Sequence, residues 1–431
     1  MRTMLAQART YDRSVQLLMA NQFTINLGFY MLMPYLAAHL SGTLGLAGWT
    51  VGLILGVRNF SQQGMFLVGG TLADRLGYKP LIVAGCLLRT AGFAALGFTT
   101  SLPALLAASA ATGLAGALFN PAVRAYLAAD AGDRRVEAFA LFNVCYQAGI
   151  LLGPLLGMAL TGVDFRLTCL VSAVVFALLS IVQIRALPAR KAAADTKAAP
   201  VAVWTVWRGI AANRPFLLFS CAMIGSYVLS FQVYLALPLE VRRLAGDGTS
   251  ETVAVALLFA VSGLSTILAQ TRLTAWCKAR LGPGAALTWG LTAMGLAFTP
   301  LLAATALPVP EAPAARWLLA ALPAALAALL LALGTMLAYP FEMDTIVRLS
   351  GDRHVATHYG FYNTISGLGI AAGNLATGAS LDAARSAGLP ALPWLVLIAL
   401  GLTCAAGLHA LHRTGRLRAA PEREQPQPAP A

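Results

Sequence analysis

Long apolar stretches recur along nearly the whole chain, and they constrain the fold more than any other feature. Each stretch runs for about 20 residues, the length of a helix that crosses the hydrocarbon core of a bilayer. Of the 431 residues, 58% are hydrophobic and only 11% are charged, whereas soluble domains carry about 25% charged residues. So few charged side chains cannot cover a water-facing surface. The sequence therefore predicts an all-α membrane protein.

Charged residues, prolines and glycines divide the apolar sequence into twelve predicted spans. The first six are 15–38, 49–71, 79–99, 102–126, 139–161 and 166–186. The second six are 214–239, 250–272, 284–304, 315–340, 355–379 and 391–412. The predicted organisation is an N-terminal six-helix bundle in 1–186, a cytoplasmic linker in 187–213, a C-terminal six-helix bundle in 214–412 and a disordered cytoplasmic tail in 413–431. Within the linker, the surroundings of Trp204 and Trp207 predict a short helix at the membrane interface.

The distribution of lysine and arginine predicts which side of the membrane each loop faces. With both termini in the cytoplasm, 23 of the 30 basic residues fall on the cytoplasmic side, and two, Arg58 and Arg89, lie within spans. The other five are Arg166, Arg242, Arg243, Arg316 and Arg385. Cytoplasmic loops of membrane proteins are enriched in Lys and Arg. We therefore assign the net charge of +13 to membrane topology and expect no nucleic-acid partner.

The same residues recur at corresponding places in the spans of the two halves of the chain. A three-residue turn, Arg-Leu-Gly, follows both the second span at 75–77 and the eighth span at 280–282. Other matched pairs are Asn143 and Asn363, Gly149 and Gly369, Gly153 and Gly373, and Pro121 and Pro340. Such echoes predict two parallel six-helix repeats, an arrangement that many transporters use for alternating access.

The loop after the second span, residues 69–80, reads Gly-Gly-Thr-Leu-Ala-Asp-Arg-Leu-Gly-Tyr-Lys-Pro. Gly70 permits a close helix approach, and Gly77 suits a turn with positive φ. Asp74 can accept hydrogen bonds from a helix N-terminus or an arginine. Arg75 and Lys79 can pair with acids on facing elements or with lipid headgroups. The alternative is a basic turn that only anchors the topology.

The fifth span contains a second motif, Gly-Ile-Leu-Leu-Gly-Pro-Leu-Leu-Gly, at residues 149–157. The glycines Gly149, Gly153 and Gly157 recur every fourth residue and form a flat face for tight helix packing. Pro154 removes one backbone hydrogen bond and permits a kink. Ordinary packing of small residues is the alternative explanation.

These motifs resemble those of the major facilitator superfamily. Residues 70–79 are similar to its signature loop, which locks the cytoplasmic gate, and the resemblance assigns that role to Gly70, Asp74, Arg75, Gly77 and Lys79. Residues 149–157 are similar to the antiporter motif, which marks exporters more than importers. Residues 58–64, 89–93, 119–121 and 164–167 resemble the drug:proton antiporter group, especially its MdtH-like multidrug-resistance members.

The resemblance covers nearly the whole first half and is looser in the second. It implies a major facilitator fold of twelve transmembrane helices, in a bacterial inner membrane, that exports a drug-like compound or a siderophore in exchange for protons. The chain departs from the pattern where it has Tyr78 in place of a basic residue and Ala20 in place of an acid in the first span. It also has Ala107, Ala108 and Ser109 where many exporters carry an arginine in the fourth span.

Charged and polar side chains within the spans are the candidates for binding cargo or protons. A charge at the bilayer centre costs about 2.5–3.5 kcal/mol, so such residues normally face a cavity or a partner. Glu342 and Asp344 follow Pro340 at the predicted end of the tenth span, as gate contacts or as solvated loop acids. With no acid near a span centre, we expect cargo with carboxylate or hydroxamate groups. The candidates are Arg58, Arg89, Asn26, Tyr30, Asn143, Gln147, Gln232, Asn363, Glu342 and Asp344.

The six cysteines have neither zinc nor redox spacing, so we expect no disulfide, metal or other cofactor. The expected partners are a small-molecule substrate, protons and the lipid bilayer, and the expected state is a monomer. A membrane enzyme is disfavoured because no His–acid, paired-acid or Cys–His arrangement occurs in or beside the spans. An ATP-driven pump is disfavoured because no phosphate-binding Gly-Lys-Ser/Thr loop occurs. An uptake transporter, a lipid flippase and a receptor that binds cargo without transporting it stay as alternatives.

Overall fold

The computed structural model describes residues 6–189, 202–245 and 249–415, which form helices and turns without a strand. The first half contains α2 (Arg13–Ala38), η1 (His39–Thr43), α3 (Gly48–Leu76), α4 (Tyr78–Phe98), α5 (Leu102–Ala131), η2 (Gly132–Arg134), α6 (Arg135–Thr161) and α7 (Phe165–Ala186). A short helix, α8 (Val203–Ala212), precedes the second half. That half contains α9 (Arg214–Ser230), η3 (Phe231–Val233), α10 (Ala236–Ala245), α11 (Thr249–Arg280), α12 (Pro283–Leu296), α13 (Thr299–Ala304), α14 (Pro313–Ser350), α15 (Val355–Ala387) and α16 (Leu392–Arg413).

Eight helical segments of the described chain are long and apolar enough to cross a membrane. One of them, Leu102–Thr161, joins α5 and α6, and two others join α9 to α10 and α12 to α13. The helices α2, α3 and α15 have spanning length but are not among the eight. They carry polar side chains such as Asn26, Gln62 and Asn363, which line the cavity described below. Counted with these three, the described residues supply the twelve predicted spans.

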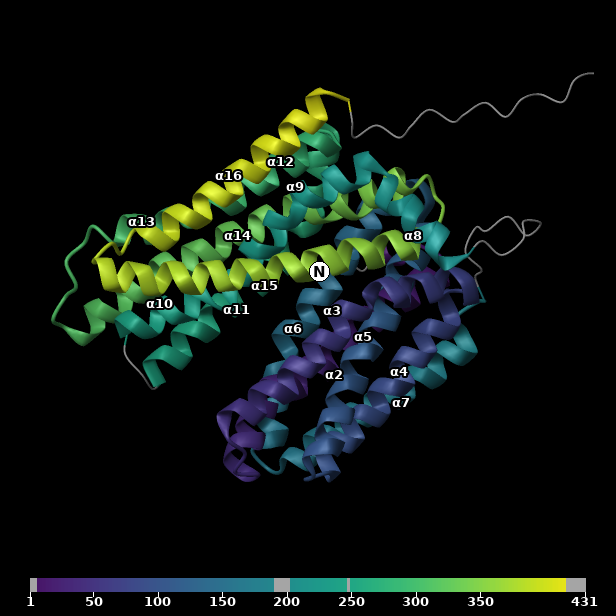
Figure 1. Ribbon diagram of the computed structural model, residues 1–431, viewed down its shortest axis with the longest axis horizontal. Coiled ribbons are helices and arrows are strands. Elements are labelled where there is room, and N and C mark those ends of the chain that lie inside the picture. Colours follow the sequence, from purple (N-terminus) through teal and green to yellow (C-terminus); the bar gives the residue numbers. More distant parts are fainter. Residues whose placement is uncertain (1–5, 190–201, 246–248, 416–431) are drawn as a thin grey trace, which may run out of the picture.

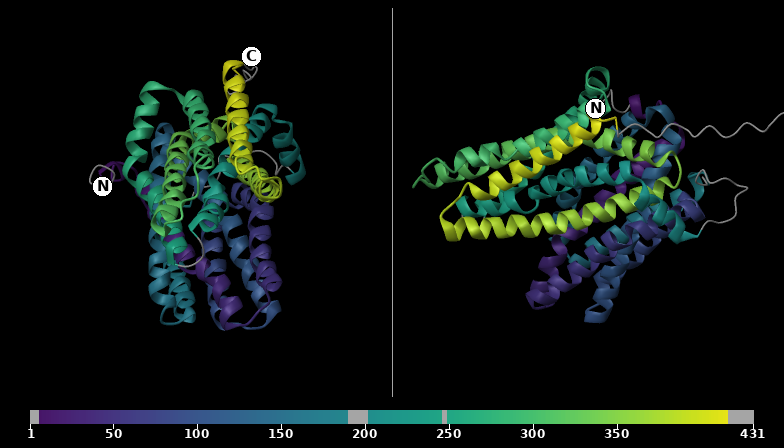
Figure 2. Two further views of the ribbon diagram at one scale, coloured as in Figure 1. Left: turned by 90° about the vertical axis from the view of Figure 1, so that its left-hand side faces the viewer. Right: turned by 45° about the horizontal axis from the view of Figure 1, so that its top comes forward.

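The helices form two bundles, one from each half of the chain (Figure 1). The bundles meet beside α8 and diverge toward their opposite ends, as the views in Figure 2 also show. We call the end that carries α8 the linker end, and the end that carries η1 and the start of α14 the far end. Across the interface α3 packs on α15 and α6 packs on α11. Each contact therefore joins the second span of one repeat to the fifth span of the other.

Small residues let helices within each bundle approach closely. A Cβ atom on Gly157 of α6 would lie 2.0 Å from the carbonyl oxygen of Met31 in α2. One on Gly149 would lie 2.7 Å from the carbonyl oxygen of Phe23. The glycine face of 149–157 therefore packs against the backbone of α2. The Tyr35 hydroxyl of α2 donates a hydrogen bond of 2.6 Å to the carbonyl oxygen of Pro154.

Several helices extend beyond the predicted ends of their spans, and this corrects the prediction for the tenth span. The apolar run stops near residue 340, but α14 continues to Ser350. The hydrogen bonds of an α-helix lie within the segment itself, so the helix persists where its surroundings become polar. Glu342 and Asp344 therefore lie in a helix and not in a loop. Longer helices than predicted are also found in α3, α5 and α11.

The described part of the linker contains a helix at the predicted place. Trp207 of α8 donates a hydrogen bond of 2.9 Å to the Thr71 hydroxyl of α3, whereas Trp204 is 65% exposed. The Asn213 side chain accepts from the backbone N–H of Phe216 at the start of α9 and donates to the carbonyl oxygen of Leu349. Much of the predicted linker and tail, residues 190–201 and 416–431, lies outside the described residues.

The contact between α2 and α6 generates the first prediction. Gly157→Ala places a methyl group against a backbone oxygen that cannot move aside, so we expect a loss of about 1–3 kcal/mol of stability. Thermal unfolding of the purified protein in detergent measures it. The matched control is Gly407→Ala in α16, where an added Cβ meets nothing within 4 Å. Equal melting temperatures for the two variants would contradict the prediction.

Candidate functional site: a central cavity and the gate at the linker end

A cavity of about 170 Å³ lies between the two bundles, halfway along the spans. The N-terminal bundle contributes residues of α2, α3, α4, α5 and α6, and the C-terminal bundle contributes residues of α9, η3 and α15. Its polar lining residues are Asn26, Tyr30, Gln62, Gln63, Arg89, Asn120, Arg124, Tyr146, Tyr227, Asn363 and Ser366. Its other lining residues are Ile25, Phe29, Phe66, Phe119, Phe231, Gly367 and Ile370. The lining therefore holds two guanidinium groups and no carboxylate.

Arg89 of α4 is 5% exposed and has only weak partners. Its guanidinium donates a 3.3 Å hydrogen bond to the carbonyl oxygen of Thr112 and lies 4.9 Å from the ring centroid of Phe29. Its Nε atom has no hydrogen-bond partner in the structure. A cation over an aromatic face gains roughly 2 kcal/mol when desolvated, which offsets part of the cost of burying the charge. Arg89 therefore brings an incompletely partnered guanidinium group to the cavity lining.

Arg124 of α5 connects the two bundles inside the cavity. Its Nη1 atom donates a 3.0 Å hydrogen bond to the side-chain oxygen of Asn363 in α15. Pro121 stands one turn earlier in α5 and cannot donate to the carbonyl oxygen of Ala117. Gly69 of α3 approaches that same carbonyl group closely, because a Cβ atom there would lie 2.1 Å from its oxygen.

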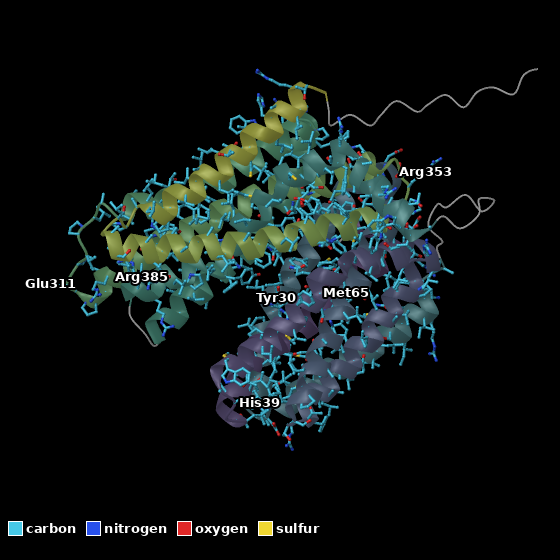
Figure 3. All side chains as sticks on the ribbon, in the orientation of Figure 1. Tyr30, His39, Met65, Glu311, Arg353 and Arg385 are labelled. Carbon is cyan, nitrogen blue, oxygen red and sulfur yellow. The ribbon has the colours of Figure 1, made fainter. Side chains whose placement is uncertain are left out.

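Three tyrosines from the two bundles lie near one another at the cavity. Tyr30 of α2 and Tyr146 of α6 line it, and Tyr234, which follows η3 in the other bundle, lies close to Tyr30. Figure 3 shows Tyr30 near the line where the bundles begin to diverge, whereas His39 and Arg385 lie at separate far ends.

Asp74 and the N-terminus of α15 form the central contact between the bundles at the linker end. Asp74 is 7% exposed and accepts hydrogen bonds from the backbone N–H groups of Ala356 (3.2 Å) and Thr357 (2.7 Å). The Thr357 hydroxyl donates a third, of 2.6 Å. Helix N-termini carry unsatisfied N–H groups and a partial positive charge, so a carboxylate there is stabilised. A Cβ atom on Gly70 would lie 2.2 Å from the carbonyl oxygen of Ala356, so only glycine allows this approach.

Ion pairs between the bundles surround that contact. Arg135 at the start of α6 pairs with Asp344 of α14 at 3.5 Å and with Asp352 at 2.9 Å. Lys278 at the end of α11 pairs with Glu137 of α6 at 2.6 Å. Pairs of this kind at a solvated surface contribute about 0–1 kcal/mol each. They join residues of different bundles, and so they hold the bundles together at the linker end.

A buried amide network joins α6, α11 and α14 beneath these pairs. The Asn143 side chain donates 2.8 Å to the Gln270 side-chain oxygen, and Gln270 donates 3.0 Å to the carbonyl oxygen of Met336. That carbonyl oxygen is free because Pro340, four residues on, has no N–H to donate. Asn143, predicted as a cargo or proton candidate, is therefore a bridge between bundles and is not among the residues that line the cavity.

Glu342 lies two residues beyond Pro340, and the structure corrects its placement. It is 3% exposed and accepts a hydrogen bond from the Tyr362 hydroxyl of α15. Tyr227, which lines the cavity, lies close to it. The sequence left this acid as a gate contact or a solvated loop acid, because the apolar run ends near it. Neighbouring aromatic residues bury it instead. Asp344 points to the gate and pairs with Arg135 and Arg348.

The remaining predicted residues lie at varied distances from the cavity. Asn26, Tyr30, Arg89 and Asn363 line it, whereas Arg58, Gln147 and Gln232 do not. Arg58 contacts its own helix through Asn59 and Gln62 and lies 5.4 Å from the Phe29 ring centroid. The structure adds Gln63, Arg124 and Tyr227 to the cavity, and Arg135, Lys278 and Gln270 to the bundle interface. Gln62 and Gln63 were detectable as an amide pair inside an apolar span.

Within the signature loop, Gly77 has a φ of 93° and separates α3 from α4. Lys79 donates a 2.8 Å hydrogen bond to the carbonyl oxygen of Ile184 near the end of α7. His39 at the far end stacks on Phe165 with a centroid distance of 3.9 Å, and burial lowers the pKa of this imidazole. The six cysteines are free, and the described residues hold no cluster that could bind a metal ion.

Comparisons with known proteins agree with this geometry. Residues 18–374 match the family described as Major Facilitator Superfamily. The chain belongs to this superfamily. An uncharacterized MFS-type transporter of Mycobacterium tuberculosis (strain ATCC 25618 / H37Rv) is 52% identical over 403 residues, which cover 94% of each chain. The multidrug resistance protein MdtH of Photorhabdus laumondii is 30% identical over 412 residues, which cover 95% of this chain and 96% of MdtH.

A crystal structure of a mutant of the peptide transporter POT in complex with sulfate has the same fold. Its TM-score is 0.65 at 19% identity, and the alignment covers 94% of this chain and 96% of that one. The superfamily, its relatives and the two six-helix bundles together identify the chain as a multi-pass membrane transporter and not an enzyme. The predicted major facilitator fold is confirmed.

The gate contact gives the second prediction. Asp74→Ala leaves two N–H groups of α15 and one hydroxyl without their acceptor, and hydrogen bonds to a charged group are worth about 1.5–3 kcal/mol each. We expect the population with a closed linker end to fall at least tenfold relative to the open one. Spin labels at Asp133 and Arg353, in a variant without the native cysteines, report the distance between the bundles there.

The control is Asp12→Ala, which removes an exposed acid before α2 whose side chain makes no capping hydrogen bond. It should leave the distance distribution as in the parent. Longer distances in this control, or unchanged distances in the Asp74 variant, would show that Asp74 does not hold the gate.

Proposed function

We propose that the chain is a proton-coupled secondary exporter that moves a small organic molecule out of the bacterial cytoplasm across the inner membrane. The observation that carries the proposal is a polar cavity between two bundles that are joined at one end and diverge at the other. Such a cavity is the central site of an alternating-access transporter. The chain works as a monomer, because both bundles that enclose the site come from one polypeptide.

The linker end faces the cytoplasm in this proposal. Basic side chains are concentrated in the loops and helix ends at the linker end, and cytoplasmic loops are enriched in lysine and arginine. At the far end the basic residues are Arg166, Arg242, Arg243, Arg316 and Arg385. Both termini are then cytoplasmic, and the structure has the cavity directed away from the cytoplasm. This is the state in which an exporter has released its cargo and takes up protons.

The cargo is an aromatic or polar molecule with an anionic or electron-rich group. Arg89 and Arg124 supply guanidinium groups to the lining, and no carboxylate opposes them. Phe29, Phe66 and Phe119 supply apolar faces against which a ring can stack. Drug-like acids and hydroxamate siderophores have this chemistry. Relatives named multidrug resistance protein MdtH, at about 30% identity, support export of drug-like compounds.

Everted membrane vesicles test the direction. The lumen of the vesicles is made more acidic than the medium. The uptake of radiolabelled benzenesulfonate, benzohydroxamate and benzyltrimethylammonium is then measured. We expect the first two to accumulate and an uncoupler to abolish the accumulation. Accumulation only in right-side-out vesicles would indicate an uptake transporter. Binding without flux would indicate a receptor, and movement of fluorescent phospholipid analogues alone would indicate a flippase.

Removing a cavity charge gives the third prediction. Arg89→Gln keeps hydrogen-bond donors but removes the positive charge, so we expect uptake of benzenesulfonate by everted vesicles to fall at least tenfold. The control is Arg385→Gln, an exposed far-end residue paired only with its neighbour Asp382. Unchanged uptake by the Arg89 variant, at equal protein level, would remove the argument for anionic cargo.

A further inference from the structure

We propose that Glu342 is the residue that binds and releases the transported proton, and that Arg124 makes its protonation depend on the position of the bundles. The inference rests on the proposed proton-coupled function, because only that function makes the bound proton a transported one. The chemistry concerns one group, a carboxyl that alternates between its neutral acid and its carboxylate.

The partners of Glu342 differ from those of the other buried acids. Asp74 accepts three hydrogen bonds at a helix N-terminus, and Glu240 accepts two from the guanidinium group of Arg243, at 2.8 and 2.7 Å. Each of these two carboxyl groups therefore has several donors. Glu342 is 3% exposed, its hydrogen bond comes from the Tyr362 hydroxyl, and no ion pair reaches it from the described part of the chain. An unpaired charge is costly to bury, so this carboxyl holds a proton in the present conformation.

The place of Glu342 lets it exchange protons with either side. On one side, Tyr227 reaches from Glu342 to the cavity, which opens away from the linker end. On the other side, Asp344 stands two residues further along α14 and belongs to the gate. The Tyr359 hydroxyl donates a 2.8 Å hydrogen bond to the carbonyl oxygen of Met343, the residue between Glu342 and Asp344. In this conformation it blocks the short path for water between the two acids. Opening of the gate would bring cytoplasmic water within one helical turn of the carboxyl.

Arg124 is the cation that responds to the bundle position. It belongs to α5 of the N-terminal bundle, whereas Glu342 belongs to α14 of the C-terminal bundle. In this conformation its Nη1 atom is bound to Asn363, the residue next to Tyr362. When the bundles rock, this bond breaks and the guanidinium is available either to anionic cargo or to the Glu342 carboxylate. A conformational change that alters this distance must also alter proton affinity, because the two are linked.

Several titratable or charged groups face Glu342 from the elements packed against it. Among them, Glu342 is the group that changes its protonation near neutral pH. The facing groups are Arg124 of α5, Tyr227 of α9, Tyr339 of α14 itself, and Tyr362 of α15. Tyr146 of α6 and Asp344 of the gate lie in the next layer. Phenols and guanidinium groups keep their protons at neutral pH. In the outward state the carboxylate takes up a proton through the cavity, and in the inward state the acid gives it to cytoplasmic water.

Infrared titration of the full-length protein in lipid vesicles tests the proton site without any cargo. The difference between acidic and alkaline spectra should contain the carbonyl stretch of a protonated carboxyl in a dry site. We expect Glu342→Gln to remove this band and Glu240→Gln, the matched buried acid, to retain it. Persistence of the band in the Glu342 variant overturns the proposal.

Two further variants keep the carboxyl and protect the test against a folding failure. Arg124→Gln removes the cation, and Tyr362→Phe removes a donor that stabilises the carboxylate. Both should shift the disappearance of the band to higher pH. The spin labels at Asp133 and Arg353 should report a pH-dependent distance in the parent and a pH-independent one in Glu342→Gln. An unshifted band in both variants would also contradict the proposal.

Transport separates this inference from the proposed function. Benzenesulfonate uptake driven by a pH gradient should be lost in Glu342→Gln, while exchange of labelled for unlabelled benzenesulfonate at equal pH should continue. If the parent transports and the variant is still driven by the gradient, the proton-site inference fails and the exporter stands. If the band is lost in the variant but the parent moves none of the three probes, Glu342 binds a proton and the proposed export function fails.

Discussion

Unsatisfied polar groups are expensive in a bilayer, and this cost organises the whole molecule. A buried polar group without a hydrogen-bond partner costs several kcal/mol in hydrocarbon. The amides and guanidinium groups of α2, α3, α5 and α15 therefore face the space between the bundles, and many of them bind across it. The bonds from Arg124 to Asn363, from Asn143 to Gln270 and from α15 to Asp74 are the result. The same bonds that satisfy polar groups hold one end of the transporter shut.

These contacts form a gate because they lie on one side of the cavity and join residues of different bundles. Individually they are modest, and the surface ion pairs of Arg135 and Lys278 contribute little stability. Collectively they break or form together when the bundles rock. A ligand or proton that favours one arrangement shifts the population by its differential affinity for the two states. Many weak bonds thus depend together on one variable, the relative position of the two bundles.

Prolines and glycines give the helices the irregularities that this arrangement needs. Pro340 frees the Met336 carbonyl oxygen for Gln270, and Pro121 weakens α5 one turn before Arg124. Gly70 lets α3 touch the backbone of α15 at the gate, and Gly157 lets α6 touch α2 within its bundle. In an apolar solvent helices gain little from the hydrophobic effect, so close backbone approach is a main source of their association. Function and packing therefore depend on the same small residues.

The sequence by itself determined the membrane class, the number of spans, the two-repeat organisation and the superfamily, because each depends on local features such as the length of an apolar run or a short motif. It also singled out Asn26, Tyr30, Arg89 and Asn363, since a polar residue inside an apolar run stands out without a structure. It left Glu342 as a gate contact or a solvated loop acid because the apolar run ends at residue 340, whereas the helix and its aromatic neighbours continue. Only the tertiary structure decided that Asn143 bridges the bundles, that Arg124 enters the cavity and that Glu342 is buried. Those facts depend on residues more than 100 positions apart or on the closure of the gate, and no local pattern records which of two bundle positions a chain adopts.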